Sequence, residues 1–218
     1  MNVSIAVREP HHLDELVKLF HATHTHNGYP VEGPPDRESL ESRLEFFAGD
    51  DPSLEILGLV ACQGRADYDA QQPNGSSGNC EELGGHENER QAGDDEGRVL
   101  GHVSLRRVSR GSVALLIWRD VTGNTKANDG LCEVCRLAVD PVAQGKGVGG
   151  TLLGAIEARA RSERKPLILG VLEKDVAAIR MYDKRGWTRF GQDKMVGRDG
   201  RVWVEHFYIC PTEQRHDQ

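Results

Sequence analysis

The most informative stretch of the chain reads VCRLAVDPVAQGKGVGG and covers residues 134–150. The apolar segment 134–139 predicts a strand, Pro141 marks a turn, and a glycine-rich run leads into a helical pattern. The first backbone N–H groups of a helix lack intrahelical partners and lie at the positive end of the helix dipole. Because glycine leaves these N–H groups uncovered, the stretch predicts a phosphate-binding site, such as one for a pyrophosphate-bearing cofactor.

Two other glycine-rich motifs do not fit this stretch. A Walker loop needs Gly-Lys followed by Ser or Thr after a four-residue spacer, and this stretch has none. The dinucleotide-binding fingerprint needs G-x-G-x-x-G in the first strand-to-helix turn and an acidic residue about 20 residues later. A tight turn that binds nothing is the remaining structural alternative.

The residues that follow predict a strand–helix–strand unit. Apolar side chains recur at helical spacing at Val148, Leu152, Leu153, Ile156 and Ala160. Pro166 ends this helix, and the segment 167–172 predicts a buried strand. Two strands joined by one helix are expected to be parallel, with a right-handed crossover. A second, short helix is predicted to begin at Asp175, which caps it, and to end at Gly186.

Two motifs in this region carry a family resemblance. The pattern QxxGxG at 144–149 resembles the acetyl-CoA pyrophosphate loop of the GNAT N-acetyltransferases. The pattern DxxAxxxYxxxGW at 175–187 resembles that family's Asn-x-x-Ala, Tyr and Gly-Phe segment. The motifs occur in the family's order, separated by one helix and one strand. Asp175 and Trp187 depart from the Asn and Phe that the family often has, which puts a side-chain contact from Asp175 to CoA in question.

The resemblance implies an α/β fold. It is a single GNAT-like domain with a mixed central sheet, in which a parallel strand–helix–strand core is flanked by helices. Acetyl-CoA is implied as co-substrate, with its pantetheine arm paired to the strand before the glycine loop. The implied cofactor-binding residues are Leu137, Ala138, Val139, Gln144, Gly145, Lys146, Gly147, Val148, Gly149, Gly150, Asp175 and Ala178.

Two residues are candidates for the chemistry. Acetyl transfer to an amine needs a base that takes the amine's proton and benefits from an acid that protonates the departing thiolate. Tyr182 occupies the position that the family uses for the acid beside the CoA sulfur. Glu133 lies on the strand that enters the glycine loop, where several family members place a catalytic glutamate. A core tyrosine and an ordinary strand-end carboxylate are the structural alternatives.

The expected function is therefore an acetyl-CoA-dependent N-acetyltransferase that acetylates the primary amine of a small molecule by direct attack. A non-catalytic acyl-CoA-binding sensor and a protein acetyltransferase, acting on lysines or N-termini, stay open. So does a structural subunit that recruits a partner through 64–97. The acidic charge of the chain favours a cationic acceptor.

Length, charge and composition limit the classes of protein to which the chain can belong. With 218 residues the chain can bury a full core, and its net charge of −7 argues against nucleic-acid and membrane-surface binding. No apolar run approaches a membrane span and no signal peptide is recognised, so a cytoplasmic protein is expected. One domain is expected over 1–212, with a mobile insertion at 64–97 and a disordered tail at 213–218. A homodimer is left open.

Two groups of potential metal ligands are interpreted as structural, so no metal is expected. Cys132 and Cys135 match C-x-x-C, but strand alternation places their sulfurs on opposite faces. His21, His24 and His26 fall at the end of a predicted helix, where they favour the helix dipole. The resemblance also allows this histidine segment to border the acceptor pocket.

Periodicity predicts the remaining elements. Strands are expected at 3–8, 54–61, 98–108, 112–119, 189–195 and 202–209. Helices are expected at 12–24 and 36–47, and loops at 28–35 and 121–130. The Asp-Gly pair at 199–200 favours a hairpin between the last two strands.

Overall fold

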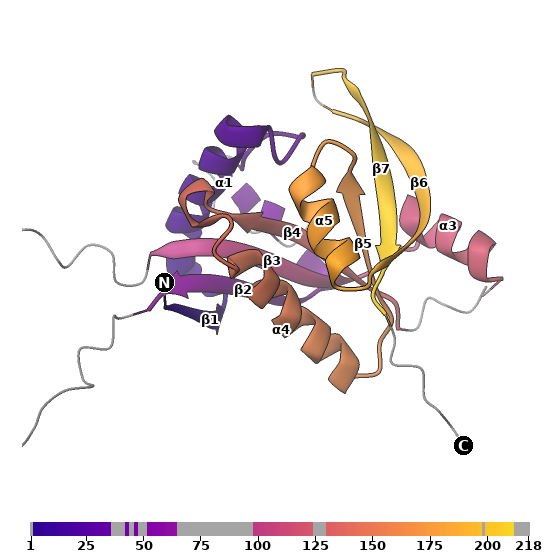
Figure 1. Cartoon of the computed structure of the whole chain (residues 1–218), viewed down its shortest axis with the longest axis horizontal. Helices are drawn as coiled ribbons and strands as arrows, with labels where there is room; N and C mark the ends of the chain where they lie inside the picture. The colour runs from indigo at the N-terminus through magenta and orange to yellow at the C-terminus, as the bar shows by residue number, and fades with distance from the viewer. Residues whose placement is uncertain are drawn as a thin grey trace, which may run out of the picture.

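A seven-stranded sheet forms the centre of the molecule (Figure 1). This computed structural model describes residues 2–35, 42–43, 46–47, 52–64, 98–123, 130–197 and 199–211. The strands are β1 (Val3–Val7), β2 (Glu55–Gln63), β3 (Val99–Arg107), β4 (Cys132–Val139), β5 (Leu167–Leu172), β6 (Thr188–Val196) and β7 (Val202–Ile209). The helices are α1 (Leu13–Asn27), α3 (Val113–Thr122), α4 (Val148–Ser162) and α5 (Val176–Lys184). Short 3-10 turns are η1 (Pro10–His12), η2 (Pro52–Leu54) and η4 (Pro141–Ala143).

The order of the strands across the sheet is β1-β2-β3-β4-β5-β7-β6. Among the strands described, neighbours pair antiparallel except β4 and β5, which pair parallel and are joined through α4. The expected α/β fold with its parallel strand–helix–strand core is therefore confirmed.

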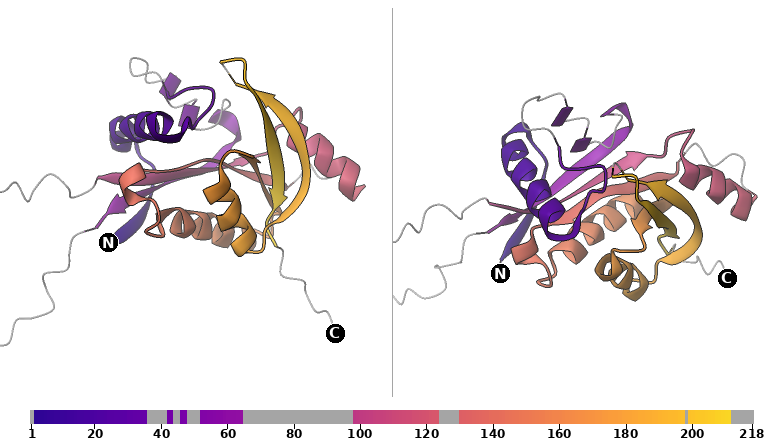
Figure 2. Two further views of the ribbon diagram at one scale, coloured as in Figure 1. Left: turned by 45° about the horizontal axis from the view of Figure 1, so that its top comes forward. Right: turned by 90° about the horizontal axis from the view of Figure 1, so that it is seen from above.

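Helices lie on both faces of the sheet. Seen from above, α4 and α5 lie on one side, while α1 and α3 lie on the other (Figure 2). Leu152, Leu153 and Ile156 of α4 are fully buried in the largest core cluster. A Cβ at Gly101 of β3 would lie 2.9 Å from the Leu152 Cδ1 atom and 3.0 Å from the Ala138 carbonyl oxygen. Glycine at this position is what lets α4 approach the sheet so closely.

The parallel pair separates along its length. Only the first three residues of β4 pair with β5, ending at Val134 opposite Leu169, although β4 itself continues to Val139. On its other edge, β4 stays paired with β3 to Val139, across a bulge at which Arg136 has a φ of 54°. A bulge bends its strand and increases the local twist. The bulge therefore lies where β4 turns away from β5, and a gap opens between them.

A buried histidine supports this bulge. The His102 Nδ1 atom lies 3.0 Å from the Arg136 carbonyl oxygen, and its Nε2 atom lies 3.2 Å from an Arg8 guanidinium nitrogen. Burial, with a further contribution from Arg8, lowers the pKa of His102 to about 3. The ring is therefore neutral. Because the carbonyl can only accept, Nδ1 carries the hydrogen and Nε2 accepts from Arg8.

One predicted element is wrong. The segment 112–119 was expected to be a strand, but 113–122 forms helix α3. A short apolar run does not distinguish strand from helix by periodicity, and packing decides the outcome here. Ala114 and Leu115 are buried, Trp118 packs edge-on against Phe190 of β6 at 5.3 Å between ring centroids, and Gly123 ends the helix in the left-handed conformation.

The other predicted elements agree with the structure within a few residues where it describes them. Of the helix expected at 36–47, residues 42–43 and 46–47 are described and are helical. The insertion expected at 64–97 lies outside the described residues after Gly64, as does the whole tail expected at 213–218. The loop expected at 121–130 begins later, because α3 extends to Thr122, and 124–129 are outside the described residues.

Candidate active site

A cavity of about 990 Å³ occupies the gap between β4 and β5. Most of the residues expected to bind the cofactor line it, namely Leu137, Val139, Gln144, Gly145, Gly147, Val148, Gly149, Gly150, Asp175 and Ala178. Both expected catalytic residues, Glu133 and Tyr182, line it too. Ala138 and Lys146 are not among the lining residues: Ala138 is buried in the core cluster of α1, and Lys146 is exposed.

One end of the cavity is formed by the start of α4. Gly147 is the N-cap, and Gly145 and Gly147 have φ values of 73° and 87°. A Cβ at either glycine would meet nothing within 4 Å. Across the described chain, the N–H groups of Gly147, Val148 and Gly149 donate to no protein acceptor, and the first bond of the helix is from Thr151 to the Gly147 carbonyl at 3.0 Å. These N–H groups can therefore hold a phosphate.

Side chains hold the turn before α4 in place. Asp140 accepts from the Val142 N–H at 3.0 Å and from an Arg98 guanidinium nitrogen at 2.8 Å. The Gln144 side-chain amide donates to the Val139 carbonyl oxygen at 3.2 Å. Gln144 of the sequence motif thus braces the end of β4, and the anion-binding capacity comes from the backbone.

The start of α5 differs from its expected form in one detail. Asp175 is the N-cap residue, as predicted, but its side chain makes no capping hydrogen bond. Instead it accepts from the Lys174 ammonium at 2.8 Å, and Lys174 also donates to the Asn27 carbonyl at 3.1 Å. The expected side-chain cap is therefore wrong, because the neighbouring lysine engages the carboxylate and connects α5 to the end of α1.

Tyr182 reaches the cavity from α5. Its side chain is buried, with ring centroids 5.8 Å from Trp187 and 6.1 Å from Tyr208. Burial first, and the nearby Asp175 carboxylate second, raise the pKa of Tyr182 above its usual range. The hydroxyl therefore stays protonated at neutral pH and is available as a proton donor.

Glu133 reaches the cavity from β4 and is held by an arginine. Its Oε2 atom accepts from the Arg106 Nε at 3.0 Å and lies 2.9 Å from a second guanidinium nitrogen. The two residues lie directly opposite each other on β4 and β3, and both side chains are largely buried. Two guanidinium nitrogens thus fix the carboxylate in place through one of its oxygens, by charge-assisted contacts.

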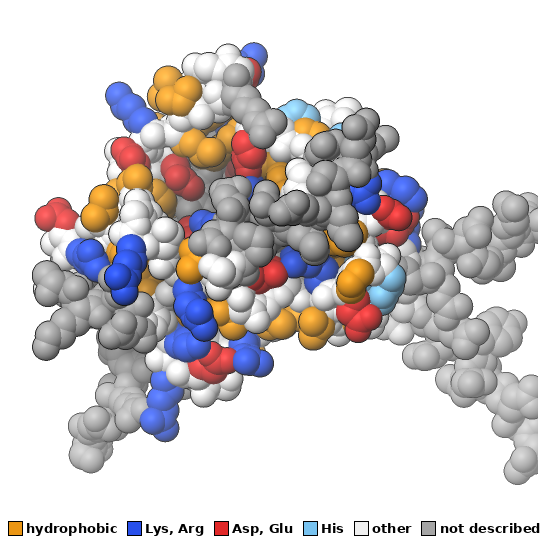
Figure 3. Space-filling view, turned by 180° about the vertical axis from the view of Figure 1, so that it is seen from behind, with side chains coloured by type: hydrophobic (Ala, Val, Ile, Leu, Met, Phe, Trp, Pro, Cys, Tyr) orange, Lys and Arg blue, Asp and Glu red, His pale blue; other side chains and the backbone are white. Residues whose placement is uncertain are grey.

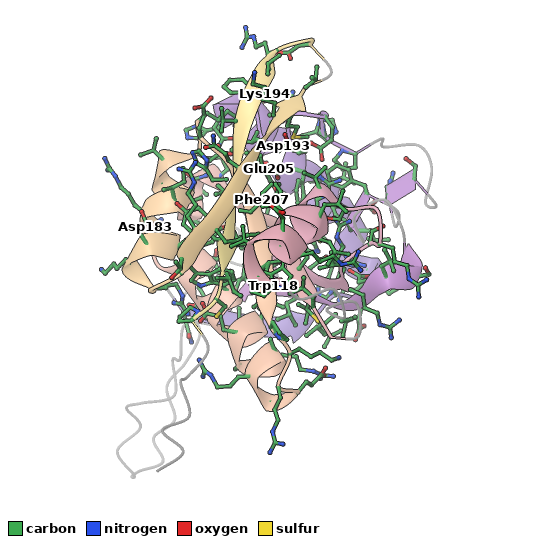
Figure 4. The ribbon with its side chains drawn as sticks, turned by 90° about the vertical axis from the view of Figure 1, so that its right-hand side faces the viewer. Trp118, Asp183, Asp193, Lys194, Glu205 and Phe207 are labelled. Carbon is green, nitrogen blue, oxygen red and sulfur yellow. The ribbon has the colours of Figure 1, made fainter. Side chains whose placement is uncertain are left out.

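A second carboxylate in the cavity, Glu205 of β7, was not singled out from the sequence. It lies opposite Leu172 of β5 on one side and Asp193 of β6 on the other. Figure 4 shows Asp193 and Glu205 close together on the hairpin, with Phe207 farther along β7 toward α3. The available signal was an acidic residue within the apolar strand WVEHFYI. On the face seen from behind, acidic side chains lie around a hollow below the tip of this hairpin (Figure 3).

The segment after α1 forms another wall of the cavity, through Tyr29, Val31 and Glu32. Two histidines fix this segment: a ring nitrogen of His21 lies 3.2 Å from the Pro35 carbonyl oxygen, and one of His24 lies 2.9 Å from that of Pro30. Glu32 forms an ion pair with Arg136 at the β4 bulge. The histidines thus act on the cavity indirectly, by holding the loop that lines it.

Among the described residues, no three His, Cys, Asp or Glu side chains come together as a metal site would require. No described helix is both long and apolar enough to cross a membrane.

Comparison with known proteins identifies the family. The model of the acetyltransferase (GNAT) family matches residues 58–187, which is more than half of the chain. The chain therefore belongs to the GNAT acetyltransferase family, as the two sequence motifs indicated. A mycothiol acetyltransferase of Streptosporangium roseum is 40% identical over 81 residues, which is 36% of this chain and 24% of that protein. The chain thus spans about a quarter of the length of this curated relative.

Solved structures share the fold. An N-acetyltransferase from Staphylococcus aureus Mu50 has a TM-score of 0.60 at 18% identity, covering 96% of this chain and 98% of its own. The acetyltransferase yncA from Salmonella typhimurium, solved with its cofactor acetyl-CoA, has a TM-score of 0.61 at 16% identity, covering 98% of this chain and 96% of its own. Acetyl-CoA, expected from the sequence, is the cofactor of this family.

Proposed function

We propose that this chain transfers the acetyl group of acetyl-CoA to the primary amine of a small molecule, by direct attack of the amine on the thioester. The observation that carries the proposal is the gap between β4 and β5. Its cavity is lined by the start of α4 with its uncovered N–H groups, by Tyr182 and by the carboxylates of Glu133 and Glu205. One cavity can therefore accommodate the pyrophosphate and thioester of the cofactor together with the amine of the acceptor.

The cofactor is proposed to enter along β4. The pyrophosphate binds the N–H groups at the start of α4, where the helix dipole favours negative charge. None of the described strands pairs with the segment 137–139 on the side that faces β5, so the backbone of Leu137, Ala138 and Val139 can pair with the amide groups of pantetheine. Arg180 and Lys184 of α5 also line the cavity and bring positive charge near the phosphates.

Tyr182 is proposed as the acid. Its hydroxyl is protonated because burial raises its pKa, and Tyr182 lines the same cavity as the start of α4, Glu133 and Glu205. It donates its proton to the sulfur as the C–S bond breaks and is reprotonated from solvent.

The acceptor is proposed to be a cationic amine. Glu32 and Glu133 are paired with Arg136 and Arg106, so the carboxylate of Glu205 leaves the acceptor end with an excess negative charge. Such a charge attracts an ammonium group and orients it toward the thioester. Either Glu133 or Glu205 is available to take the proton that the amine must lose.

A thiol-release assay tests the proposal. Acetyl-CoA is incubated with the protein and a panel of small primary amines, and free CoA is measured against a blank without acceptor, because the chain itself has five cysteines. Amine-dependent CoA release with a matching acetylated product supports the proposal. CoA binding without turnover would favour a sensor, and turnover only with peptide N-termini or lysines would favour a protein acceptor.

A further inference from the structure

We propose that Glu205 is the catalytic base of this chain, and that Glu133, held by Arg106, is a positioning residue beside it. This inference rests on the proposed acetyl transfer to an amine. It assigns the proton-accepting step to a residue of the β6–β7 hairpin, outside both sequence motifs.

The Glu205 carboxylate lies where the gap between β4 and β5 begins. Pairing of β4 with β5 ends at Leu169, and Gly170 is the next residue of β5. A Cβ at Gly170 would collide with the Glu205 carboxylate, so this carboxylate lies directly over the first residue of the gap. The same cavity reaches Tyr182 from the other face of the sheet. Acid and base thus flank the place where the thioester would lie.

The carboxylates of Glu133 and Glu205 differ in their hydrogen bonding. Oε2 of Glu133 already accepts from two nitrogens of Arg106, at 3.0 and 2.9 Å. The Glu205 carboxylate has no such partner: the backbone of Glu205 pairs within the sheet, but among the described residues no group forms a hydrogen bond or ion pair with its carboxylate oxygens. Protonation of Glu133 would weaken its ion pair with Arg106, whereas the Glu205 carboxylate has no ion pair to lose, so Glu205 is the better placed of the two to accept a proton.

Burial and the neighbouring charges together set the pKa of Glu205. Burial raises the pKa of Glu205 to about 7, with further contributions from the Glu133 carboxylate of β4 and the Asp193 carboxylate of β6, opposed by Arg106 of β3. On the β5 side it faces uncharged Gly170 and Leu172. A carboxylate that titrates near the operating pH is suited to accept a proton and release it again.

The ammonium group of the bound acceptor first releases one proton to solvent. The neutral amine nitrogen forms a bond to the acetyl carbon, the C–S bond breaks with its electron pair on sulfur, and the sulfur takes the Tyr182 proton. The proton lost by the nitrogen passes to Glu205. Release of that proton to solvent and reprotonation of Tyr182 restore the enzyme, with an N-acetyl amine and free CoA as products.

The test compares kcat across pH, at saturating acceptor, for the wild type and three variants: Glu205→Gln, Glu133→Gln and Asp193→Asn. The wild type should lose activity on the acid side with an apparent pKa near 7. This fall of kcat at low pH is the acid limb of the pH profile. Glu205→Gln should lower kcat by roughly 10²–10⁴-fold and abolish the acid limb. Asp193→Asn removes an adjacent carboxylate from outside the cavity, so it should stay within a few-fold of the wild type. CoA-induced thermal stabilisation of each variant checks that it is folded.

The outcomes separate two failures. If the wild type releases no CoA with any amine, the proposed function fails and the assignment of the base falls with it. If the wild type is active and Glu205→Gln keeps its rate and its acid limb, only the present inference is overturned. An acid limb that is lost in Glu133→Gln and kept in Glu205→Gln would assign the base to Glu133.

Discussion

The two ends of the cavity are built in different ways. The cofactor end consists of consecutive backbone groups at the start of α4, with glycines that leave them uncovered. The acceptor end consists of side chains from β3, β4 and β7 and from the segment after α1, which are far apart in the chain. The first end is proposed to bind a phosphate through backbone groups whatever the acceptor is, whereas the proposed role of the second end depends on each individual side chain. Substitutions should therefore affect the two ends differently.

The largest effect is expected at the cofactor end. Gly147→Asp places a carboxylate beside the proposed pyrophosphate position, at a φ of 87°. A unit charge about 5 Å away at an effective dielectric constant of about 20 costs on the order of 3 kcal/mol, or more than about 100-fold in affinity. Isothermal titration with CoA measures the loss. Gly200→Asp is the matched control, because Gly200 also has a positive φ, 77°, and open space at Cβ. Equal CoA affinity in both variants would contradict the site.

The second-largest effect is expected at Tyr182. Tyr182→Phe keeps the ring and removes the proposed acid, so kcat should fall by about 100-fold, the low end of what general acids contribute, while CoA affinity stays unchanged. Steady-state kinetics and titration separate the two quantities. Tyr208→Phe is the control, because Tyr208 is equally buried and contacts the same ring but does not line the cavity. A similar loss in both variants would point to packing rather than proton donation.

A smaller effect is expected on stability at the acceptor end. The pKa of Glu205 is raised from 4.5 to about 7, so the folded state binds its proton more tightly than the unfolded state. This group therefore costs stability as pH rises from about 4.5 to 7, and the full cost persists above 7. Glu205→Gln should raise the free energy of unfolding by roughly 1–3 kcal/mol at pH 8, and less toward pH 5. Urea unfolding at both pH values measures this, and a pH-independent difference would contradict it.

The smallest effect is expected on the pH dependence of kcat, which tests the electrostatics of the acceptor end. Arg106→Gln removes a positive charge near Glu205, which disfavours the ionised form, so the acid limb of kcat should move up by roughly 0.5–1 pH unit. Asp193→Asn removes a negative charge and should move the limb down. Arg107→Gln is the control, because Arg107 carries the same charge but is exposed and does not line the cavity. Shifts of equal sign in Arg106→Gln and Asp193→Asn would show that Glu205 does not set the limb.

The same contrast explains which parts could be predicted. The glycine loop, α4, β5 and α5 were predicted because hydrophobic spacing and glycine positions are local properties of the chain. Helix α3 was mistaken for a strand because its apolar run, VALLIW, fits either element. Its packing on β6, through Trp118 against Phe190, decided the outcome. Asp175 was predicted correctly as the N-cap residue of α5, but the contact from Lys174 that takes up its side chain was not predicted.

The sequence by itself determined the strand–helix–strand unit, the uncovered N–H groups of α4 and the place of Tyr182, because each depends on residues close together in the chain. Only the tertiary structure decided how far β4 and β5 separate, since this follows from a bulge at Arg136 that His102 of another strand supports. The tertiary structure also brought Glu205 over Gly170 and tied Glu133 to Arg106. Electrostatic interactions depend on distance in space and on burial, and neither quantity is encoded in sequence spacing.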